Sequence, residues 1–480
     1  MTGVPDSIFR EYDIRGTGKE LTPEIAELLG RAYAIYIKKH GLNPGPDFKV
    51  SIGRDVRLTS DGLFEGLKKG LLSSGINIID IGTCPTPLQY FSMHTLPVKG
   101  GVMITGSHNP PEYNGFKVSV GKETIYGEEI QRLKRIINEE VIGKPLPKIE
   151  AGKVEKADII SRYVDYVAGN IKLPKLKRPL KVVLDSGNGT AGPVAIQLVK
   201  RLGCEVIDLF SEPDGRFPNH HPDPTVPANI KDLIDTVKRE RADFGVAYDG
   251  DADRIGVVDE KGGIIWGDKL MIIFSRAILE VTPGVTVVGE VKSSQVMYDE
   301  IAKAGGKPVM WKTGHSLIKA KMKELGALMA GEMSGHIFFA DRWFGFDDAI
   351  YSSCRLMEIT AEKLAKDGQF VFSSLLSGLP RTIVTPEIRI DCPDDVKFAV
   401  IDRLDEAIGK GTKEFKVKDI IKIDGLRVNF EGGWALVRAS NTQPVLVLRF
   451  EAENEKLLEQ AKGFIKERLQ LVRPGSALNF

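Results

Sequence analysis

Three aspartates at alternate positions, Asp249, Asp251 and Asp253, give the clearest sign of chemistry in the chain. They follow the apolar residues 244–248 and precede the apolar residues 255–259, so a tight loop between two strands can turn the three carboxylates toward one centre. Hard oxygen ligands of this kind suit Mg²⁺, which keeps positions for water or a phosphate oxygen. Because clustered carboxylates repel one another, this acidic loop (residues 249–254) is a candidate metal site.

Two other structures are compatible with the spacing of the acidic loop. An EF-hand would place ligands at Asp249, Asp251, Asp253 and Glu260, but Arg254 stands where that motif requires glycine. The flanking residues are also strand-like, so we reject the EF-hand. A solvated acidic turn without a metal stays open.

A serine with a histidine beside it follows another strand-like segment. Residues 101–105 form a buried apolar strand that ends at Gly106, and Pro110 closes the turn that contains Ser107 and His108. Open α/β sheets place their chemistry at the carboxyl ends of strands, and this serine loop (residues 105–110) presents a hydroxyl at such an end. An ordinary loop is the alternative, but other polar loops follow strands in the same way.

Two further polar loops come after short apolar segments. The hairpin loop (residues 331–336) holds Glu332, Ser334 and His336, which could hydrogen-bond sugar hydroxyls; a plain hairpin turn is the alternative. The C-terminal loop (residues 438–444) offers a donor-rich cradle for a phosphate, and a polar hairpin tip is the alternative. Its donors are on Arg438, Ser440, Asn441 and Thr442.

Isolated basic and aromatic residues could add contacts to a ligand. Lys292 and His315 each come shortly after an apolar segment, although either could lie on the surface. Near the N-terminus, Tyr12 and Arg15 could touch a phosphate or a sugar, and a solvated N-terminal arm is the alternative. None of these residues decides the function alone.

A glycine-rich stretch offers a function of another class. Residues 187–192, Gly-Asn-Gly-Thr-Ala-Gly, match the dinucleotide-binding fingerprint between a strand and a helix, with Asp208 near the usual acidic position. This pattern supports a nicotinamide oxidoreductase as a runner-up. The acidic and serine loops would have no task in such an enzyme, so we interpret the glycines as a tight strand-to-helix turn.

The composition fits a multi-domain protein of the cytoplasm. The 480 residues carry a net charge of +1, so no overall field favours nucleic acid or a membrane surface. The N-terminal residues do not resemble a signal peptide, and no apolar run approaches membrane-spanning length. The cysteines are too scattered for a metal site and fit reduced, buried thiols. They are Cys84, Cys204, Cys354 and Cys392.

Strand-like and helix-like segments alternate in three rounds, which predicts three consecutive mixed-sheet α/β domains of similar topology. In the first round, residues 48–54 predict a strand and residues 60–73 a helix. Strands cluster before the last helix, so a smaller α+β domain follows. Residues 143–156 are a candidate linker and residues 377–380 a candidate hinge. We expect domains at residues 1–153, 154–262, 263–374 and 375–480.

Taken together, the loops resemble those of the α-D-phosphohexomutase superfamily, and the resemblance covers essentially the whole chain. Thr105-Gly-Ser-His-Asn-Pro110 is similar to the family's phosphoserine loop, and Asp249-Gly-Asp-Ala-Asp-Arg254 to its metal loop. Gly331-Glu-Met-Ser-Gly-His336 is similar to its sugar-selecting loop, and Arg438-Ala-Ser-Asn-Thr442 to its phosphate loop. Met333 and His336 favour the phosphomannomutase/phosphoglucomutase group over the glucosamine group.

The resemblance implies four domains around one central cleft, each contributing one loop. It implies a phosphohexomutase that interconverts hexose 1-phosphate and hexose 6-phosphate through phosphorylated Ser107 and a hexose 1,6-bisphosphate. Ser107, Asp249, Asp251 and Asp253 would hold Mg²⁺. Groups near the transfer site would be His108, Lys117, Arg254 and Arg15. Contacts to the sugar would be Tyr12, Lys292, His315, Glu332, Ser334, His336 and Asp347, and contacts to the second phosphate Arg438, Ser440, Asn441 and Thr442.

The resemblance further implies glucose 1,6-bisphosphate or mannose 1,6-bisphosphate as activator, sugar phosphates as partners, and a cytoplasmic monomer or small homo-oligomer. The general base stays open among Lys117, His108 and Arg15. Alternatives are a phosphoglucosamine mutase, a metal-dependent phosphohydrolase and a non-catalytic sugar phosphate sensor. A phosphohydrolase would release inorganic phosphate, and a sensor would bind without turnover.

Overall fold

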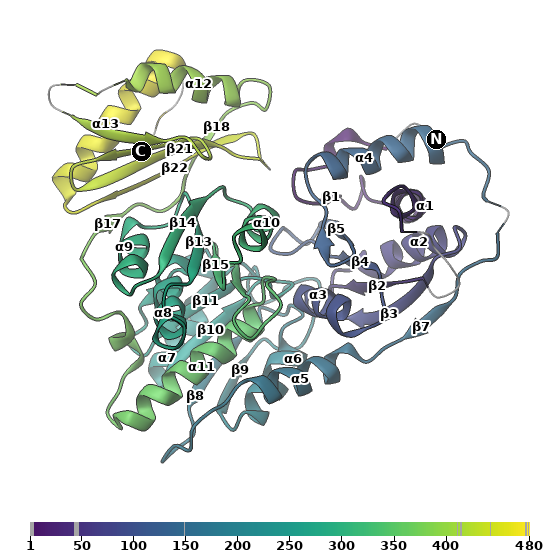
Figure 1. The fold of residues 1–480 in the computed structure, drawn as a ribbon, viewed down its shortest axis with the longest axis horizontal. Coiled ribbons are helices and arrows are strands. Elements are labelled where there is room, and N and C mark those ends of the chain that lie inside the picture. The colour runs from purple at the N-terminus through teal and green to yellow at the C-terminus, as the bar shows by residue number, and fades with distance from the viewer. Residues whose placement is uncertain are drawn as a thin grey trace.

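The computed structural model describes residues 4–42, 48–147, 149–409, 411–412, 415–441, 443–475, 478 and 480. These residues form four sheets in chain order, of seven, five, four and six strands. In Figure 1 the first domain lies on the right, the second and third lie at the lower left, and the fourth lies at the upper left. The expected series of three α/β domains and a smaller α+β domain is confirmed.

The first sheet has the order β1-β5-β4-β2-β3-β7, with β6 beside β5. Its strands are β1 (Ile14–Thr17), β2 (Lys49–Arg54), β3 (Asn77–Thr83), β4 (Gly100–Ile104), β5 (Tyr113–Val120), β6 (Glu123–Thr124) and β7 (Val154–Lys156). On one face lie α1 (Pro23–Lys39), α2 (Ser60–Leu72), α4 (Glu128–Ile136) and the short η2 (Ile137–Val141), and on the other α3 (Thr86–Thr95). Strands β4 and β2 are parallel, whereas β5 is antiparallel to both β4 and β1.

Three features of this sheet differ from the expectation. The N-terminal segment, which begins with η1 (Asp6–Ile8), is not a solvated arm, because Phe9 and Ile14 are buried and β1 pairs with β5. The candidate linker, residues 143–156, ends in β7, which pairs in parallel with β3. Strand β5 was not expected at all, since its sequence mixes glycine, asparagine and lysine with apolar residues.

The second and third sheets have the orders β12-β11-β10-β8-β9 and β14-β13-β15-β16. Elements of the second domain are α5 (Ile159–Asn170), β8 (Lys181–Asp185), α6 (Gly192–Arg201), β9 (Glu205–Leu209), η3 (Pro227–Ile230), α7 (Lys231–Glu240), β10 (Phe244–Tyr248), β11 (Ile255–Asp259) and β12 (Ile264–Ile265). Those of the third are α8 (Gly267–Val281), β13 (Thr286–Glu290), α9 (Gln295–Lys303), β14 (Lys307–Trp311), α10 (His315–Leu325), β15 (Met329–Gly331), β16 (Ile337–Phe339), α11 (Ala349–Lys366) and η4 (Phe372–Leu376). Each sheet joins parallel strands to an antiparallel edge.

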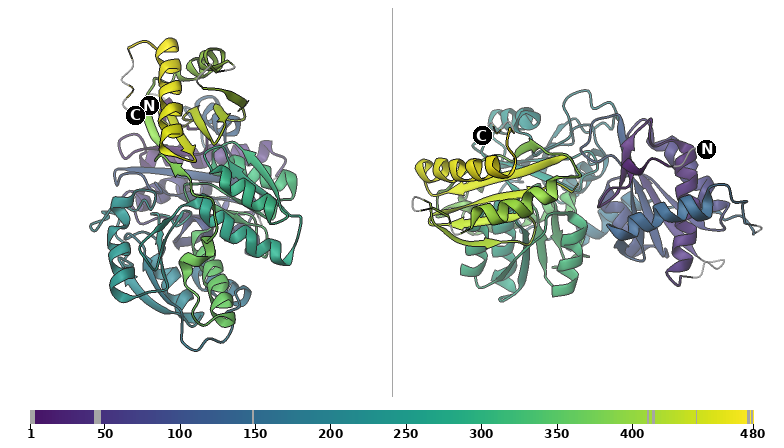
Figure 2. Two further views of the ribbon diagram at one scale, coloured as in Figure 1. Left: turned by 90° about the vertical axis from the view of Figure 1, so that its left-hand side faces the viewer. Right: turned by 90° about the horizontal axis from the view of Figure 1, so that it is seen from above.

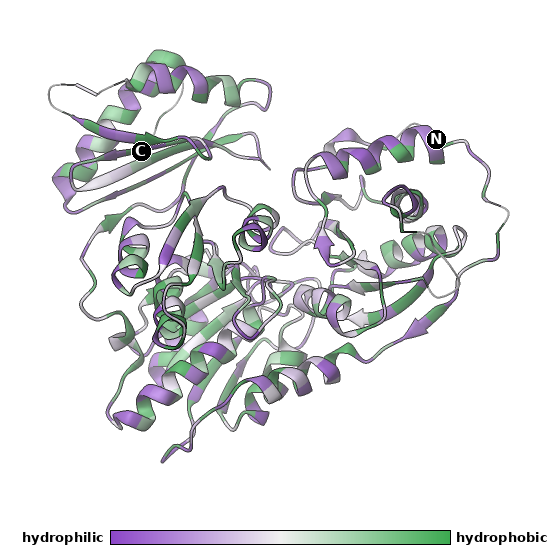
Figure 3. Ribbon diagram, in the orientation of Figure 1, coloured by the Kyte–Doolittle hydropathy of each residue, from purple (hydrophilic) through white to green (hydrophobic). Residues whose placement is uncertain are grey.

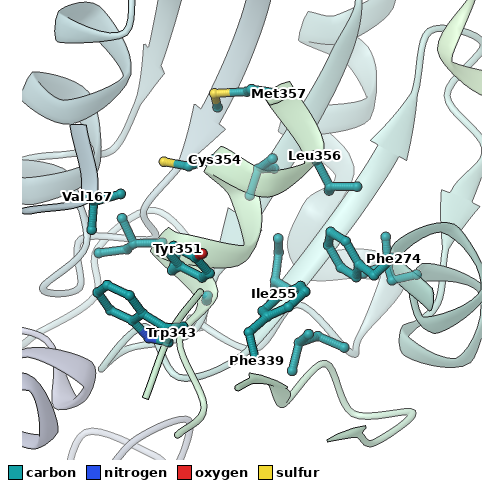
Figure 4. Packing of buried hydrophobic residues seen from close by; sticks show 14 of the residues in the cluster. Val167, Ile255, Phe274, Phe339, Trp343, Tyr351, Cys354, Leu356 and Met357 are labelled. Atoms are coloured by element: carbon teal, nitrogen blue, oxygen red, sulfur yellow. The ribbon is translucent and has the colours of Figure 1, made fainter. Parts of the chain in front are cut away.

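One continuous apolar core joins the second and third domains and reaches α3 of the first. Figure 4 shows α11 running through this core, with Cys354 and Met357 facing one side and Tyr351 stacked near Trp343. All four cysteines are buried and unpaired. In Figure 3 the central strands are mostly hydrophobic and the outer helices mix both kinds of residue, as expected for sheets covered by amphipathic helices.

The fourth sheet is antiparallel and carries its helices on one face. Its strands are β17 (Ile383–Val384), β18 (Ile388–Asp391), β19 (Val417–Ile421), β20 (Leu426–Phe430), β21 (Gly433–Ala439) and β22 (Val445–Ala452), and its helices α12 (Lys397–Ile408) and α13 (Glu455–Val472). Figure 2 shows this domain resting on the third domain. Among the helices of the described residues, none combines the length and apolar character that crossing a bilayer requires.

The contact between the third and fourth domains is polar and buried. Arg427 of β20 donates to the carbonyls of Val291 and Ser293 at 2.7 Å each. Glu451 of β22 accepts from the Ser294 hydroxyl at 2.6 Å at the start of α9. The loop that carries Lys292 is therefore held by the fourth domain.

Asp348 provides a test of the contact between the second and third domains. Its carboxylate caps α11 through the Tyr351 N–H at 2.8 Å and accepts from the Tyr163 hydroxyl of α5 at 2.9 Å. Burial raises the pKa of Asp348 to about 7. The folded state thus holds this proton more tightly than the unfolded chain, so the stability that Asp348 contributes is lost as the pH rises from about 4 to about 7.

Asp348→Asn keeps the cap and the acceptor but removes the titration. As the pH rises from 5 to 8, the variant should gain about 2 to 3 kcal/mol of stability relative to the unaltered protein, because the unaltered protein loses about 1.4 kcal/mol per pH unit up to the pKa of Asp348. Urea unfolding of both proteins at the two pH values measures the difference. A difference that does not change with pH contradicts the assignment, and Asp158→Asn, at the exposed cap of α5, is the matched control.

Candidate active site

The serine loop and the acidic loop are in direct contact, although they come from different domains. The Ser107 hydroxyl donates to Asp249 Oδ2 at 2.8 Å and lies 3.1 Å from Nδ1 of His108. A Cβ atom added to Gly250 would lie 2.5 Å from the Ser107 carbonyl, so the two backbones can approach this closely only with glycine there. The structure thus brings the predicted nucleophile to the predicted metal ligands.

The three carboxylates of the acidic loop are fully buried between β10 and β11. Asp249, Asp251 and Asp253 offer oxygens that lie within 4.8 Å of one another. Oδ1 of Asp251 and Oδ1 of Asp253 have no hydrogen-bond partner among the described residues. Buried carboxylate oxygens without partners are costly, and a hard divalent cation would satisfy them, so the acidic loop fits a metal.

Lys117 brings a positive charge into direct contact with the acidic loop. It lies on β5, and its ammonium donates to Asp251 Oδ2 at 2.9 Å and to Asp253 Oδ2. Burial alone would lower the pKa of Lys117, but Asp251 and Asp253 raise it well above its usual value. Lys117 is therefore a fixed cation. The pKa of Asp249, in contrast, is raised well above its usual range by burial and by the charges of Asp253 and Asp251.

The hairpin loop meets the acidic loop through Arg254. The Nε–H of Arg254 donates to Nε2 of His336 at 2.9 Å, which places the histidine proton on Nδ1. That Nδ1 lies 3.0 Å from Asp347 Oδ2 and 3.6 Å from Asp253 Oδ1. His336, expected among the sugar contacts, therefore lies beside the transfer site.

Asp347 is surrounded by basic side chains. Nζ of Lys319 is 3.4 Å and Nδ1 of His315 is 3.9 Å from its oxygens. Burial would raise the pKa of Asp347, but Lys319 and His336 lower it well below its usual range. Its carboxylate is fully buried beside His336 and His315, and its contact with a sugar stays a prediction.

The N-terminal segment and the C-terminal loop meet at the third domain. The Tyr12 hydroxyl donates to the carbonyl of Thr313 at 2.9 Å and accepts from the Asn441 amide at 2.6 Å. Arg438 donates to Asp424 at 3.0 Å, and the same carboxylate accepts from the Thr313 N–H at 3.0 Å. Residues of the first, third and fourth domains thus converge at Thr313.

The remaining predicted residues lie near these groups in different ways. Lys292 is buried, 3.3 Å from Glu387 and 3.6 Å from Glu290. Arg15 pairs with Asp13, and Glu332 accepts from the Gly314 N–H at 2.6 Å. Ser440 is buried and accepts from the Gln443 N–H at 3.2 Å, whereas Ser334 is half-buried. Thr442 lies outside the described residues.

Several residues of the site were not found from the sequence. The hydroxyls of Thr86 and Thr105 donate to Asp251 at 2.6 and 3.1 Å, and Asp55 accepts from the Gly106 N–H at 3.0 Å. Asp55 and Arg57 directly follow β2, which is parallel to β4. Charged residues at the carboxyl end of this neighbouring strand could therefore have predicted that Asp55 and Arg57 belong to the site.

The glycine-rich turn, residues 187–192, supports the acidic loop. The Thr190 N–H donates to the Gly250 carbonyl at 3.0 Å, and a Cβ atom at Gly189 would lie 2.7 Å from the same oxygen. The interpretation of this stretch as a strand-to-helix turn is confirmed, because it connects β8 to α6. Its glycines allow contact with the acidic loop.

Comparison with known proteins agrees with this geometry. Models of phosphoglucomutase/phosphomannomutase alpha/beta/alpha domains I, II and III match residues 6–141, 161–263 and 266–375, and the model of the C-terminal domain matches residues 387–468. A phosphomannomutase/phosphoglucomutase of Pseudomonas aeruginosa is 48% identical over 472 residues, which cover 98% of this chain and 96% of the relative. A phosphoglucomutase of Neisseria meningitidis is 44% identical, over 99% of this chain and 100% of the relative.

Among solved structures, a phosphoglucomutase/phosphomannomutase family protein from Burkholderia thailandensis superposes with a TM-score of 0.89. It is 40% identical, and the match covers 99% of this chain and 100% of that one. The four domain models occur here in the same order as the four sheets. The chain belongs to the phosphoglucomutase/phosphomannomutase family, within the α-D-phosphohexomutases.

Proposed function

We propose that the protein interconverts hexose 1-phosphates and hexose 6-phosphates of mannose or glucose, through phosphorylated Ser107 and a hexose 1,6-bisphosphate. The observation that carries this proposal is the 2.8 Å contact between the Ser107 hydroxyl and Asp249 of a three-carboxylate site. The 1,6-bisphosphate of glucose or mannose would serve as activator. The activity is that of a mutase, and the sugar is chosen by the hairpin loop.

The chemical task is to bring two phosphate groups together. A phosphoserine carries about two negative charges at neutral pH, and the sugar phosphate brings a second anion. Asp249, Asp251, Asp253 and an oxygen on Ser107 would hold Mg²⁺, which withdraws charge from the transferring phosphoryl group when bound. Lys117 and Arg254 add fixed positive charge where charge develops in the transition state.

The contacts of Lys117, His108 and Arg15 support one of them as the proposed general base. Lys117 stays protonated between Asp251 and Asp253, and Arg15 is a guanidinium, which does not lose its proton in proteins. Burial and Arg254 lower the pKa of His108 well below its usual value, so it is neutral and lies 3.1 Å from Ser107 Oγ. We favour His108 as the general base.

The second phosphate would bind at the C-terminal loop, with Arg438, Ser440, Asn441 and Thr442 as donors. Nε of Arg438 forms an ion pair with Asp424 Oδ2 at 3.0 Å, so a phosphate would share or replace that contact. After the bisphosphate has turned end for end, the same residues bind its other phosphate group. Contacts to the sugar are proposed for Tyr12, Lys292, His315, Glu332, Ser334, His336 and Asp347.

Turnover of mannose, glucose and glucosamine 1-phosphates, each with a trace of 1,6-bisphosphate, tests the proposal. Conversion of the first two to 6-phosphates is expected. Preference for the glucosamine substrate would indicate a phosphoglucosamine mutase, and release of inorganic phosphate would indicate a phosphohydrolase. We place the protein in the cytoplasm because its four cysteines are buried and unpaired, and we propose a monomer or small homo-oligomer that acts on sugar phosphates.

Ser107→Ala removes the group that accepts the phosphoryl. Turnover should fall to background while the circular dichroism spectrum and melting temperature stay close to those of the unaltered protein. A coupled assay of 6-phosphate formation measures the loss. Full turnover in the variant contradicts the nucleophile assignment, and Ser119→Ala, a buried serine of β5, is the control for folding.

Mg²⁺ binding should release protons. Burial and the neighbouring aspartates raise the pKa of Asp249, and metal binding requires the carboxylate form. Titration calorimetry in two buffers with different ionisation enthalpies should therefore give different heats, and Asp249→Asn should lose the difference. Equal heats in both buffers contradict the assignment, and Asp259→Asn at the far end of β11 is the control.

Arg438→Ala removes a charged donor from the cradle. The KM for either hexose 1-phosphate should rise by an amount equivalent to about 2 kcal/mol, because a hydrogen bond to a charged group is lost. Steady-state kinetics with both sugars measures the change. An unchanged KM rules out the role, and Arg403→Ala on the outer helix α12 is the matched control.

A further inference from the structure

The carbonyl groups of the serine loop are held by two basic side chains. Arg57 is buried, and its two Nη atoms donate to four carbonyls of this loop and the start of β5. These carbonyls belong to Ser107 at 2.8 Å, Asn109 at 2.6 Å, Pro110 at 2.6 Å and Tyr113 at 2.8 Å. The remaining carbonyl of the run, that of His108, accepts from Nε2 of His221 at 2.5 Å. Every carbonyl from Ser107 to Pro110 therefore accepts a hydrogen bond from Arg57 or His221.

Arg57 is itself fixed in place. Its Nε lies 3.2 Å from Asp55 Oδ2, and the same oxygen accepts from the Gly106 N–H at 3.0 Å. A Cβ atom at Gly106 would lie 2.3 Å from Nε of Arg57, so the loop can close over the guanidinium only with glycine there. The ring of Phe217 covers the guanidinium at 5.4 Å.

The second half of this arrangement comes from the second domain. Phe217 and His221 lie on the segment between β9 and η3, so the second domain supplies the ring that covers Arg57 and the histidine that binds the His108 carbonyl. His220 Nε2 lies 3.0 Å from Asp185 Oδ1 at the end of β8, which fixes the segment next to His221. Asn188 of the glycine-rich turn accepts from the Asn219 amide at 2.7 Å. The turn that resembles a dinucleotide fingerprint therefore holds the segment that reaches the serine loop.

This arrangement has two physical consequences for Ser107. Ser107 has a φ of 50°, a left-handed conformation that costs a non-glycine residue free energy and persists only where its surroundings hold it. Carbonyl oxygens carry partial negative charge, and turning them toward Arg57 keeps them away from a phosphate on Oγ. Arg57 provides its contacts within the first domain, and His221 adds one from the second.

We propose that Arg57 and His221 are positioning residues for phosphoryl transfer. They hold the serine loop in the conformation that aims Ser107 at the acidic loop, and they turn its carbonyl groups away from the phosphate. This inference rests on the proposed function, in which Ser107 carries the phosphoryl group. It predicts that loss of these contacts slows transfer without weakening the binding of the sugar phosphate.

The test compares Arg57→Lys, His221→Ala and His221→Gln with the unaltered protein. A lysine keeps the charge but cannot reach four carbonyls, so kcat should fall about 100-fold with KM unchanged within about twofold. His221→Ala should lower kcat about 10-fold, and the amide of His221→Gln can donate to the same carbonyl and should restore most of it. Arg31→Lys is the matched control, because Arg31 donates to two loop carbonyls, of Lys144 and Pro145, away from the site.

Two further measurements do not depend on turnover. Intact-mass measurements should show slower phosphate uptake by Ser107 from glucose 1,6-bisphosphate in Arg57→Lys, and hydrogen exchange of residues 105–110 should be faster. Unchanged exchange and uptake, an equal loss in Arg31→Lys, or His221→Gln as impaired as His221→Ala would each overturn the inference. An unaltered protein without turnover counts against the proposed function instead, and the exchange measurement then still decides whether Arg57 holds the loop.

Discussion

The site depends on the balance of charge around three buried carboxylates. Asp249, Asp251 and Asp253 have no exposed surface, and the Ser107 hydroxyl lies against the first of them. Only one lysine, Lys117, is hydrogen-bonded to this group among the described residues. Such a concentration of negative charge is stable only with a cation, and a phosphate on Ser107 would increase the need for one.

This requirement explains why the site is spread over four domains. The first domain contributes the nucleophile and Lys117, the second the carboxylates and Arg254, and the third the histidines that Asp347 orients. The fourth domain reaches the others through Asn441, which donates to Tyr12 at 2.6 Å, and through Asp424 at Thr313. Arg427 joins the fourth domain to the loop of Lys292, so movement of this domain would also displace a predicted sugar contact.

Local patterns were enough to predict the parts of the fold and site that depend on local sequence. The helix expected at residues 60–73 is α2 (Ser60–Leu72), and the serine and acidic loops follow β4 and β10 as expected. Each of these signals is an abrupt change from apolar to polar residues at the end of a strand. The domain boundaries expected after residues 153, 262 and 374 stay a prediction.

The missed features depend on contacts between distant segments. Strand β5 lacks a clean apolar alternation because it packs between β1 and β4 and carries Lys117 toward the acidic loop. Arg57 and His221 are 164 positions apart, and nothing local shows that both reach the serine loop. The contacts of His336 with Arg254 and Asp347 likewise have no local signal, and its assignment to the sugar stays a prediction.

The central claim is that one phosphoryl group passes between Ser107 and the sugar without entering water. Enzyme phosphorylated on Ser107 with ¹⁸O-labelled phosphate, mixed once with unlabelled glucose 1-phosphate, tests it directly. The account predicts that the label leaves the protein in the sugar bisphosphate or the 6-phosphate, while Ser107 acquires unlabelled phosphate. Label that appears as inorganic phosphate, or stays on Ser107 while product forms, would contradict it.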